Sequence, residues 1–432
     1  MSSSAVQNAP SSPPPAIPRP VPVVTPPQTS PPSTISTEKK SKLSLSPTNR
    51  NRNEKEKDSN EHHSAAYGCS FSRQWLIHVA QETLEIAQVG YYINQSGVKV
   101  NISKSLKYSI ENSMHYHSSH EFGAGSKGTT TGDAIGGTGA IADNSASTKR
   151  RQESYETEFH VCWGSSLQIA SKLQEELETR FKVDTGAETS PSFASSTPLP
   201  SRYEIGILNS ASGKYPDKFL RGTISQEEGI CRASLLYPCL KQYKDRPHHF
   251  YYINSKPKYY ESSSSCAIYC PKVPIIRQDD SIGRVLDNPK YFSIVNIPAP
   301  NAFVLGESLD NDAGEEDANN KPAVVPTAQK PGADLRHEPY EHMTIDAAMN
   351  DRIYRAISIF AENGCTDLVL CAFGCGVHGN NPQKIAKTFS NILQSNEFRG
   401  RFRIVAFAIQ QSRHSNYEAF TKVFLGRKVD GG

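Results

Sequence analysis

Two adjacent glutamates, Glu227 and Glu228, follow Gln226 and stand directly ahead of an apolar stretch with helical spacing in "TISQEEGICRASLLYPCL". Paired carboxylates at a helix start can divide their roles, one ionised to hold a substrate hydroxyl and the other protonated to donate to a leaving oxygen. The same residues form a capping box, in which Ser225 accepts from the backbone of Glu228 and the carboxylate of Glu228 reaches back to Ser225. The two interpretations require different burial of the glutamates.

A second candidate site is the sequence "DLVLCAFGCGVHGNNPQKIAKTF", which runs from a buried strand through a glycine-rich turn into a helix. Asn381 is the predicted cap of this helix, and Pro382 lies in its first turn. Such a turn presents backbone N–H groups and the positive end of a helix dipole. The pattern therefore predicts an anion site, most naturally for a diphosphate.

Two other phosphate-binding motifs fit this turn less well. Gly374, Gly376 and Gly379 match G-x-G-x-x-G, but the next strand ends at Gln410 and Gln411, without the acidic residue that would hold a ribose. A Walker loop is excluded because no Gly-Lys-Ser/Thr follows. A plain tight turn would need one glycine rather than three.

Histidine and cysteine clusters indicate no metal site. His115, His117 and His120 have no usual zinc spacing and border a glycine-rich segment, which favours a solvated loop. The pairs Cys371/Cys375 and Cys266/Cys270 begin in predicted strands and are expected to be small core residues. The chain has nine cysteines. We expect free thiols, as in a reducing compartment.

The elements that must position these residues alternate between helix and strand, which predicts one α/β domain with three layers, a mixed sheet between helices. Strands such as "DLVLCAF" and "FRIVAFAI" are apolar almost throughout, as in a sheet covered on both faces. Helices are expected at 72–89, 104–116, 165–181, 226–243, 343–363, 382–395 and 416–425, and strands at 158–161, 203–208, 267–277, 291–299, 367–373 and 402–409.

The remaining sequence is unsuited to packing. Residues 1–66 are rich in Pro and Ser and are expected to be a disordered tail; its basic stretch could be a nuclear-import signal or a solvated charge run. Low-complexity insertions are predicted near 118–151, 184–201 and 306–341. No apolar run approaches the roughly 18 residues that span a bilayer. We expect a soluble protein inside the cell, in the nucleus, the cytoplasm or both. A net charge of +3 is too small to indicate nucleic acid.

Four ordered motifs, spread over about 72–425, resemble the microbial-type (bacterial-type) poly(ADP-ribose) glycohydrolases, which have a macrodomain fold. These motifs are "RQWLIHVAQETLEIAQVGYYINQSGVKVNI", "LNSASGKYPDKFLRGTISQEEGICRASLLYPCL", "YFSIVNIPAPNA" and "LVLCAFGCGVHGNNPQKIAKTF". The resemblance implies that residues 67–432 form such a domain. It also implies hydrolysis of the O-glycosidic bond at the terminal ribose of poly(ADP-ribose), without a metal or cofactor.

The resemblance assigns roles to individual residues. Glu228 would protonate the leaving oxygen and then activate water, while Glu227 holds ribose hydroxyls. Asn209 would meet the distal ribose. The resemblance does not assign the adenine pocket, for which Phe420 and Asn416 are candidates because they follow the last strand. The other substrate-binding candidates are Gln226, Gly374, Cys375, Gly376, Val377, His378, Gly379 and Asn380.

The chain departs from the family pattern at two places. Pro216, Asp217 and Lys218 stand where the family has a proline and three glycines, so side chains are expected to narrow the pocket and Asp217 to repel a diphosphate. His378 replaces an aromatic phenylalanine. The alternative function is therefore a macrodomain that binds ADP-ribose marks without turnover. Expected partners are poly(ADP-ribose) or ADP-ribosylated proteins, without sequence-specific nucleic acid or a membrane, and the protein is expected to be a monomer. A third possibility is a structural domain in which the glutamates only cap.

Overall fold

The computed structural model describes residues 72–122, 154–185, 203–256, 264–280, 282–303 and 344–426, although not the side chains of 181–185. The chain divides into the units Met1–Arg52 and Asn53–Gly432, and all described residues lie in the second. The predicted tail, and most of the predicted insertions, lie outside the described residues. None of the helices in the described ranges is long and apolar enough to cross a membrane.

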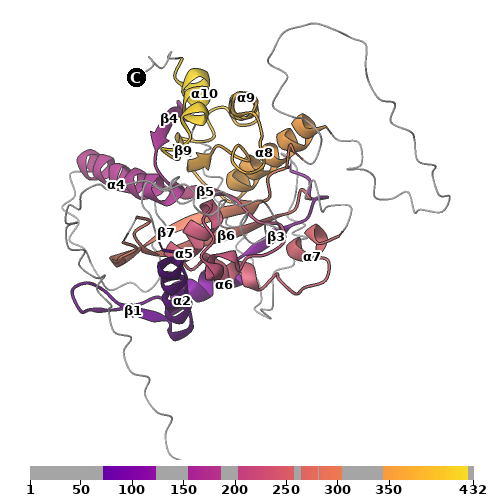
Figure 1. Ribbon diagram of the computed structural model, residues 1–432. Coiled ribbons are helices and arrows are strands. Elements are labelled where there is room, and N and C mark those ends of the chain that lie inside the picture. Colours follow the sequence, from indigo (N-terminus) through magenta and orange to yellow (C-terminus); the bar gives the residue numbers. More distant parts are fainter. Residues whose placement is uncertain are drawn as a thin grey trace, which may run out of the picture. The chain divides into compact units, whose positions relative to one another are not determined.

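A seven-stranded mixed sheet forms the centre of the fold (Figure 1), in the order β3-β6-β7-β5-β8-β9-β4. The strands from β7 to β4 are parallel to one another, while β6 is antiparallel to both β3 and β7. The strand bounds are β3 Met114–Tyr116, β4 Glu158–Trp163, β5 Ile205–Ser210, β6 Ala267–Arg277, β7 Val285–Ile297, β8 Asp367–Cys371 and β9 Ile404–Ile409. A separate hairpin pairs β1 (Tyr91–Ile93) with β2 (Lys99–Asn101).

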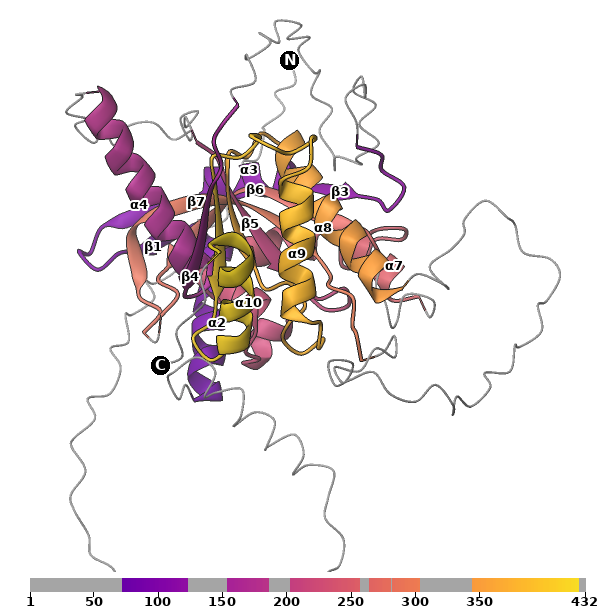
Figure 2. The same ribbon diagram turned by 90° about the horizontal axis from the view of Figure 1, so that it is seen from above.

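Helices cover both faces of the sheet, as Figures 1 and 2 show. One face packs against α4 (Ser166–Thr185), α5 (Gln226–Ala233), α6 (Leu236–Lys241) and α7 (Phe250–Asn254). The other packs against α8 (Ile345–Glu362), α9 (Pro382–Leu393) and α10 (His414–Phe424). Helices α2 (Arg73–Val89) and α3 (Ser103–Glu111) lie beside the first group. The predicted three-layer α/β fold is confirmed.

Strand β9 shows how the sequence builds two cores at once. All of its residues are buried, and successive side chains point to opposite faces. Ile404, Ala406 and Ala408 join the α4–α7 core, while Val405, Phe407 and Ile409 join the α8–α10 core. This alternation explains why the strand is apolar throughout.

Two predicted helices were wrong in part. The helix predicted at 104–116 ends at Glu111, and Met114–Tyr116 instead forms the edge strand β3. The helix predicted at 226–243 is interrupted at Ser234, which is extended, with φ −139° and ψ 173°. Pro238 favours a break here, because it has no N–H to donate to the carbonyl of Ser234. The pattern also missed the hairpin and α7.

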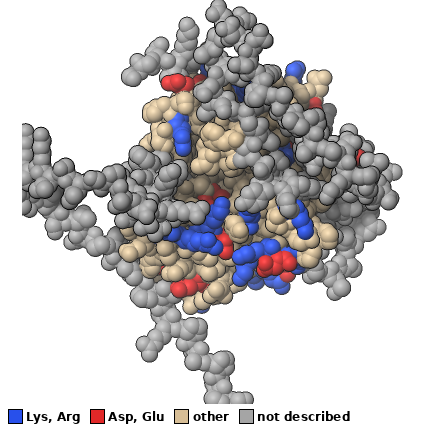
Figure 3. Space-filling view, turned by 45° about the vertical axis from the view of Figure 1, so that its right-hand side comes forward, with Lys and Arg blue, Asp and Glu red and all other residues tan. Residues whose placement is uncertain are grey.

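The parallel strands place five loops at one edge of the sheet. The carboxyl ends of β4, β5, β7, β8 and β9 all point the same way, and the segments that follow them meet there. Open α/β sheets bind ligands at this edge. On the face shown in Figure 3, Lys and Arg side chains lie interspersed with Asp and Glu.

Candidate active site

A cavity of about 560 Å³ lies at the carboxyl edge of the sheet. Its volume falls within the range of about 300–1,000 Å³ that is usual for small-molecule sites. The walls are the start of α5 and the loops after β4, β5, β7, β8 and β9. Of the predicted site residues, those on the cavity surface are Gln226, Glu227, Glu228, Gly374, Gly376, Val377, His378 and Asn416.

Gln226 fixes the start of α5 against the sheet. Its Oε1 accepts from the backbone N–H of Ser210 at 2.8 Å, and its Nε2 donates to the carbonyl of Leu208 at 2.9 Å. Nε2 also donates to the hydroxyl of Ser166 at 2.7 Å. The amide therefore joins α5 to β5 and α4, and the position of the two glutamates that follow depends on it.

Glu227 has a buried carboxyl group, of which one oxygen is hydrogen-bonded within the protein. Its exposed fraction is 2%, and its Oε2 accepts from the backbone N–H of Ser212 at 3.0 Å. The buried Oε1 has no partner among the described residues. Burial, and then the charge of Glu228, raise the pKa of Glu227 to about 8, against the opposing effects of Ser212, Lys218 and Asn209. This oxygen is available to a ligand hydroxyl.

Glu228 is also buried, with an exposed fraction of 4%. Burial raises the pKa of this carboxyl above its ordinary value, although its own backbone N–H, Lys218 and Arg232 oppose the shift. The predicted capping box is absent: Ser225 makes no side-chain cap hydrogen bond, and its hydroxyl instead donates to Oε2 of Glu228. Solvated caps do not need such burial, so the structure favours a chemical role for the pair.

The raised pKa of Glu227 predicts a pH-dependent stability. Between the ordinary value of 4.5 and about 8, the folded protein keeps a proton that the unfolded chain releases. The free energy of unfolding should therefore fall as pH rises through this interval, by up to about 1.4 kcal/mol per pH unit. Thermal unfolding of Glu227→Gln between these pH values should show a weaker decline. An equal decline in the variant and the parent would contradict the assignment.

The loop after β8 carries three backbone N–H groups that donate to no described residue, those of Gly376, Val377 and His378. The neighbouring amides of Cys375, Gly379 and Asn380 are used within the turn, at 3.1–3.2 Å. The first amides of α9 are capped by Asn381, which accepts from Gln383 and Lys384. Successive unpaired N–H groups form an anion-binding concavity. The loop, more than the helix end, is therefore the candidate anion site.

Two glycines shape this loop for different reasons. Gly374 has φ +72°, and a Cβ there would lie 2.6 Å from Nδ2 of Asn380. A Cβ at Gly376 would meet nothing within 4 Å, since it would point into open space. Gly374 thus permits the turn itself, whereas Gly376 leaves room beside the free amides.

Four predicted binding residues lie behind the cavity surface. Asn209 is fully buried, and its Nδ2 donates to Oδ1 of Asn296 at 2.8 Å. The amide of Asn380 donates to the carbonyls of Pro300 and Gly374, which closes the turn. Cys375 is buried in the α8–α10 core, and Gly379 packs against the ring of Phe303.

The remaining predicted residues fall in different environments. His378 lines the cavity, where burial and Lys218 lower its pKa while the carbonyl of Ala299 opposes the shift. Asn416 also lines the cavity. Phe420 cannot line it, because this ring is fully buried between Phe407 and Phe424; that expectation was wrong.

The histidine cluster is not the solvated loop that its spacing suggested. His115 is buried on β3, and its ring centroid lies 5.2 Å from that of His249. Burial, followed by His249 and His117, lowers the pKa of His115 to about 3. No group of three possible metal ligands was found among the residues that the structure describes.

The cysteines behave largely as predicted. Cys266 and Cys270 are core residues, as is Cys375, but Cys371 is half-buried and lines the cavity. The eight cysteines in the described ranges are free thiols.

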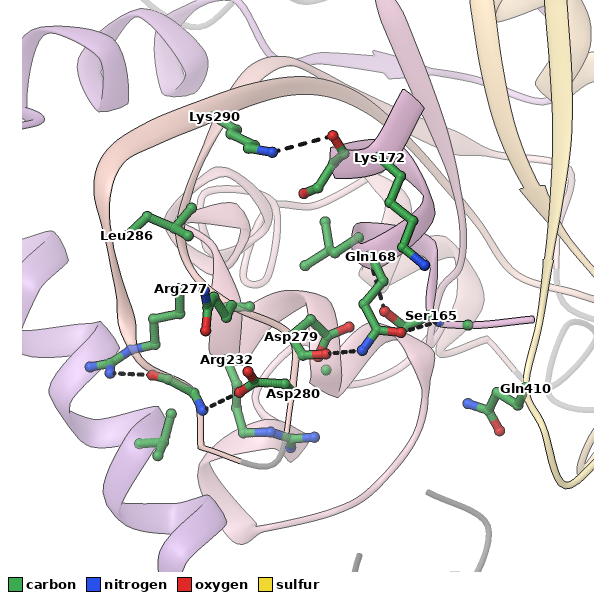
Figure 4. A pocket seen from close by; sticks show the side chains of 18 of the residues that line it. Ser165, Gln168, Lys172, Arg232, Arg277, Asp279, Asp280, Leu286, Lys290 and Gln410 are labelled. Atoms are coloured by element: carbon green, nitrogen blue, oxygen red, sulfur yellow. Dashed lines mark hydrogen bonds between the residues drawn. The ribbon is translucent and has the colours of Figure 1, made fainter. Parts of the chain in front are cut away.

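A second cavity, of about 760 Å³, shares part of its wall with the first, including Ser165, Gly229 and Asp279. Figure 4 shows hydrogen bonds among some of the residues that line it. Gln168 donates to the carbonyl of Asp279 at 2.6 Å, and Lys290 pairs with Glu175 at 2.7 Å. The acid pair and the free amides line only the smaller cavity, which is therefore the candidate active site.

The fold and this site define a macrodomain-like protein with a buried acid pair. Residues 80–278 match the family described as the microbial-type PARG (poly(ADP-ribose) glycohydrolase) catalytic domain. The family match and the similar solved glycohydrolase structure confirm the resemblance that the motifs indicated. The matched residues include Gln226, Glu227 and Glu228 but not the loop after β8.

Solved structures are also similar. The poly(ADP-ribose) glycohydrolase from Thermomonospora curvata shares 25% identity and a TM-score of 0.55, covering 81% of this chain and all of that one. The same enzyme bound to the inhibitor ADP-HPD shares the fold, with 24% identity, a TM-score of 0.52 and coverage of 81% and 99%. A search of curated proteins found no match.

Proposed function

We propose that this protein is a poly(ADP-ribose) glycohydrolase that cleaves the O-glycosidic bond of a terminal ADP-ribose unit. The observation that carries the proposal is that one cavity holds a buried carboxyl pair and three backbone amides that donate to no described residue. A diphosphate on the amides and a ribose beside the carboxyls would satisfy both. The family match over residues 80–278 and the similar glycohydrolase structure support the same substrate.

Glu228 acts first as an acid and then as a base. Burial favours its protonated form, so it can donate a proton to the leaving ribose oxygen as the bond to the anomeric carbon breaks. The oxocarbenium-like centre is stabilised by the nearby diphosphate. Glu228, now ionised, then takes a proton from the water that adds to the anomeric carbon, which restores the acid and releases ADP-ribose.

Glu227 positions the ribose. Its Oε2 is held by the backbone of Ser212, while the unpartnered Oε1 can accept from a ribose hydroxyl. A buried acceptor without a partner is costly, and a ligand hydroxyl would remove that cost. Gln226 acts indirectly, because its amide holds the start of α5 against β5.

The alternative is a macrodomain that binds ADP-ribose marks without turnover, because the family glycines are missing at Asp217 and Lys218. A purely structural role is disfavoured, since the glutamates are buried without capping and three loop amides have no acceptor in the part of the chain that the structure describes. We also propose that residues 67–432 form one domain and that the protein is a monomer. It needs no metal and binds no specific nucleic acid sequence. It works in the nucleus, the cytoplasm or both.

Incubation with purified poly(ADP-ribose) tests the proposal. The enzyme should shorten the polymer and release free ADP-ribose, measured by chromatography of the nucleotide products. Unchanged polymer, together with measurable binding of ADP-ribose in calorimetry, would establish the reader instead. If ADP-ribose does not bind at millimolar concentration, both functions are refuted.

A further inference from the structure

Lys218 occupies a distinctive place in the cavity wall. It is the first residue of a short 3₁₀ helix, η2 (Lys218–Arg221), in the segment where the related family has glycines. Its side chain lines the cavity together with Glu227, Glu228 and His378. These three residues come from α5 and from the loop after β8, so Lys218 lies within reach of both walls.

The residues on either side of Lys218 are anchored away from the cavity. Oδ2 of Asp217 lies 3.1 Å from Nζ of Lys244 in an ion pair, and Asp217 does not line the cavity. Phe219 is almost fully buried, and its ring centroid lies 5.0 Å from that of Tyr237. The expected repulsion between Asp217 and a diphosphate is therefore wrong. Between these two anchors, Lys218 is the residue left to face the ligand.

The charge of Lys218 is not neutralised by an ion pair with any residue in the described ranges. Its electrostatic effect reaches Glu227, Glu228 and His378 alike, which is consistent with an ammonium group between them. Burial favours the protonated, neutral forms of the two glutamates. The cavity thus contains a lysine that makes no ion pair with a described residue.

We propose that Lys218 is a substrate-binding residue whose ammonium group contacts the diphosphate of the bound ADP-ribose unit. The diphosphate is the only charged group of that unit, and the free amides of Gly376, Val377 and His378 would hold it from the other side. A flexible lysine is a common phosphate ligand. This inference rests on the proposed function.

Calorimetric titration with ADP-ribose tests the role of Lys218. Loss of one charge-assisted hydrogen bond predicts that Lys218→Gln binds about tenfold to a hundredfold more weakly. The parent should lose affinity with added salt more steeply than the variant, because salt screens the removed charge. Lys218→Arg, which keeps the charge, should retain most of the affinity.

Lys172→Gln is the matched control, because Lys172 lines only the neighbouring cavity and its substitution should leave ADP-ribose affinity unchanged. Equal thermal unfolding midpoints would show that the variants are folded. If Lys218→Gln binds as tightly as the parent and shifts only the pH profile of hydrolysis, Lys218 acts on the acid pair and this inference is overturned. If the parent itself binds no ADP-ribose, the proposed function is refuted with it.

Discussion

Substitution of Glu228 by glutamine should reduce poly(ADP-ribose) hydrolysis by about 10²- to 10⁴-fold, the usual contribution of a general acid and base. Glutamine keeps the size of the side chain and can still accept the hydroxyl of Ser225, but it can neither give nor take the proton. The side chain is buried and its neutral form is favoured, so folding should be little affected. Initial rates of ADP-ribose release would measure the effect.

The affinity for ADP-ribose must be measured together with the rate of poly(ADP-ribose) hydrolysis. Glu228→Gln should bind ADP-ribose with nearly the affinity of the parent, since the diphosphate contacts lie on another wall. Glu418→Gln on the exposed face of α10 is the control for the chemical change alone. A rate in Glu228→Gln equal to that of the parent would remove Glu228 from its role as the acid.

Substitution of Gly376 by leucine should lower the affinity for ADP-ribose by at least about a hundredfold. The backbone there is not left-handed, and a Cβ would meet nothing within 4 Å, so the folded chain can accept the side chain. Leucine would then fill the space beside the free amides and exclude a diphosphate. Calorimetry should show weak or no binding, with an unchanged unfolding midpoint.

Gly374→Ala is the informative comparison, because substitution of Gly374 should lower stability, whereas substitution of Gly376 should lower the affinity for ADP-ribose. At Gly374 the backbone has φ +72° and a Cβ would lie 2.6 Å from Asn380, so alanine should lower the unfolding midpoint. A stable Gly376→Leu variant with parental affinity would show that the anion site is not at this loop.

The sequence predicted the layered fold because periodic apolar segments report burial directly, as in β9. The sequence pattern could not predict a helix break that depends on pairing with a residue far away in the chain. Ser234 leaves the helical path at a bridge with Ile275, more than forty residues later, and Pro238 alone did not identify the position of that break. Short elements such as β3 depend on pairing with β6, which local pattern does not contain.

The candidate site was predicted best where the motif is local. Glu227, Glu228 and the loop after β8 lie together in one cavity, as their motifs suggested. The direction of individual side chains was not predictable: Asn209 and Asn380 point into the protein, and Phe420 is buried among other rings. Lys218 was missed as a contributor because its direction depends on the anchors at Asp217 and Phe219.

A crystal structure of Glu228→Gln with ADP-ribose would test the central claim most directly, namely that the acid pair and the loop amides act on the same ligand. We predict that the diphosphate accepts from the amides of Gly376, Val377 and His378, and that the terminal ribose lies beside residues 227 and 228. A diphosphate bound elsewhere, or a terminal ribose out of reach of residue 228, would contradict the account.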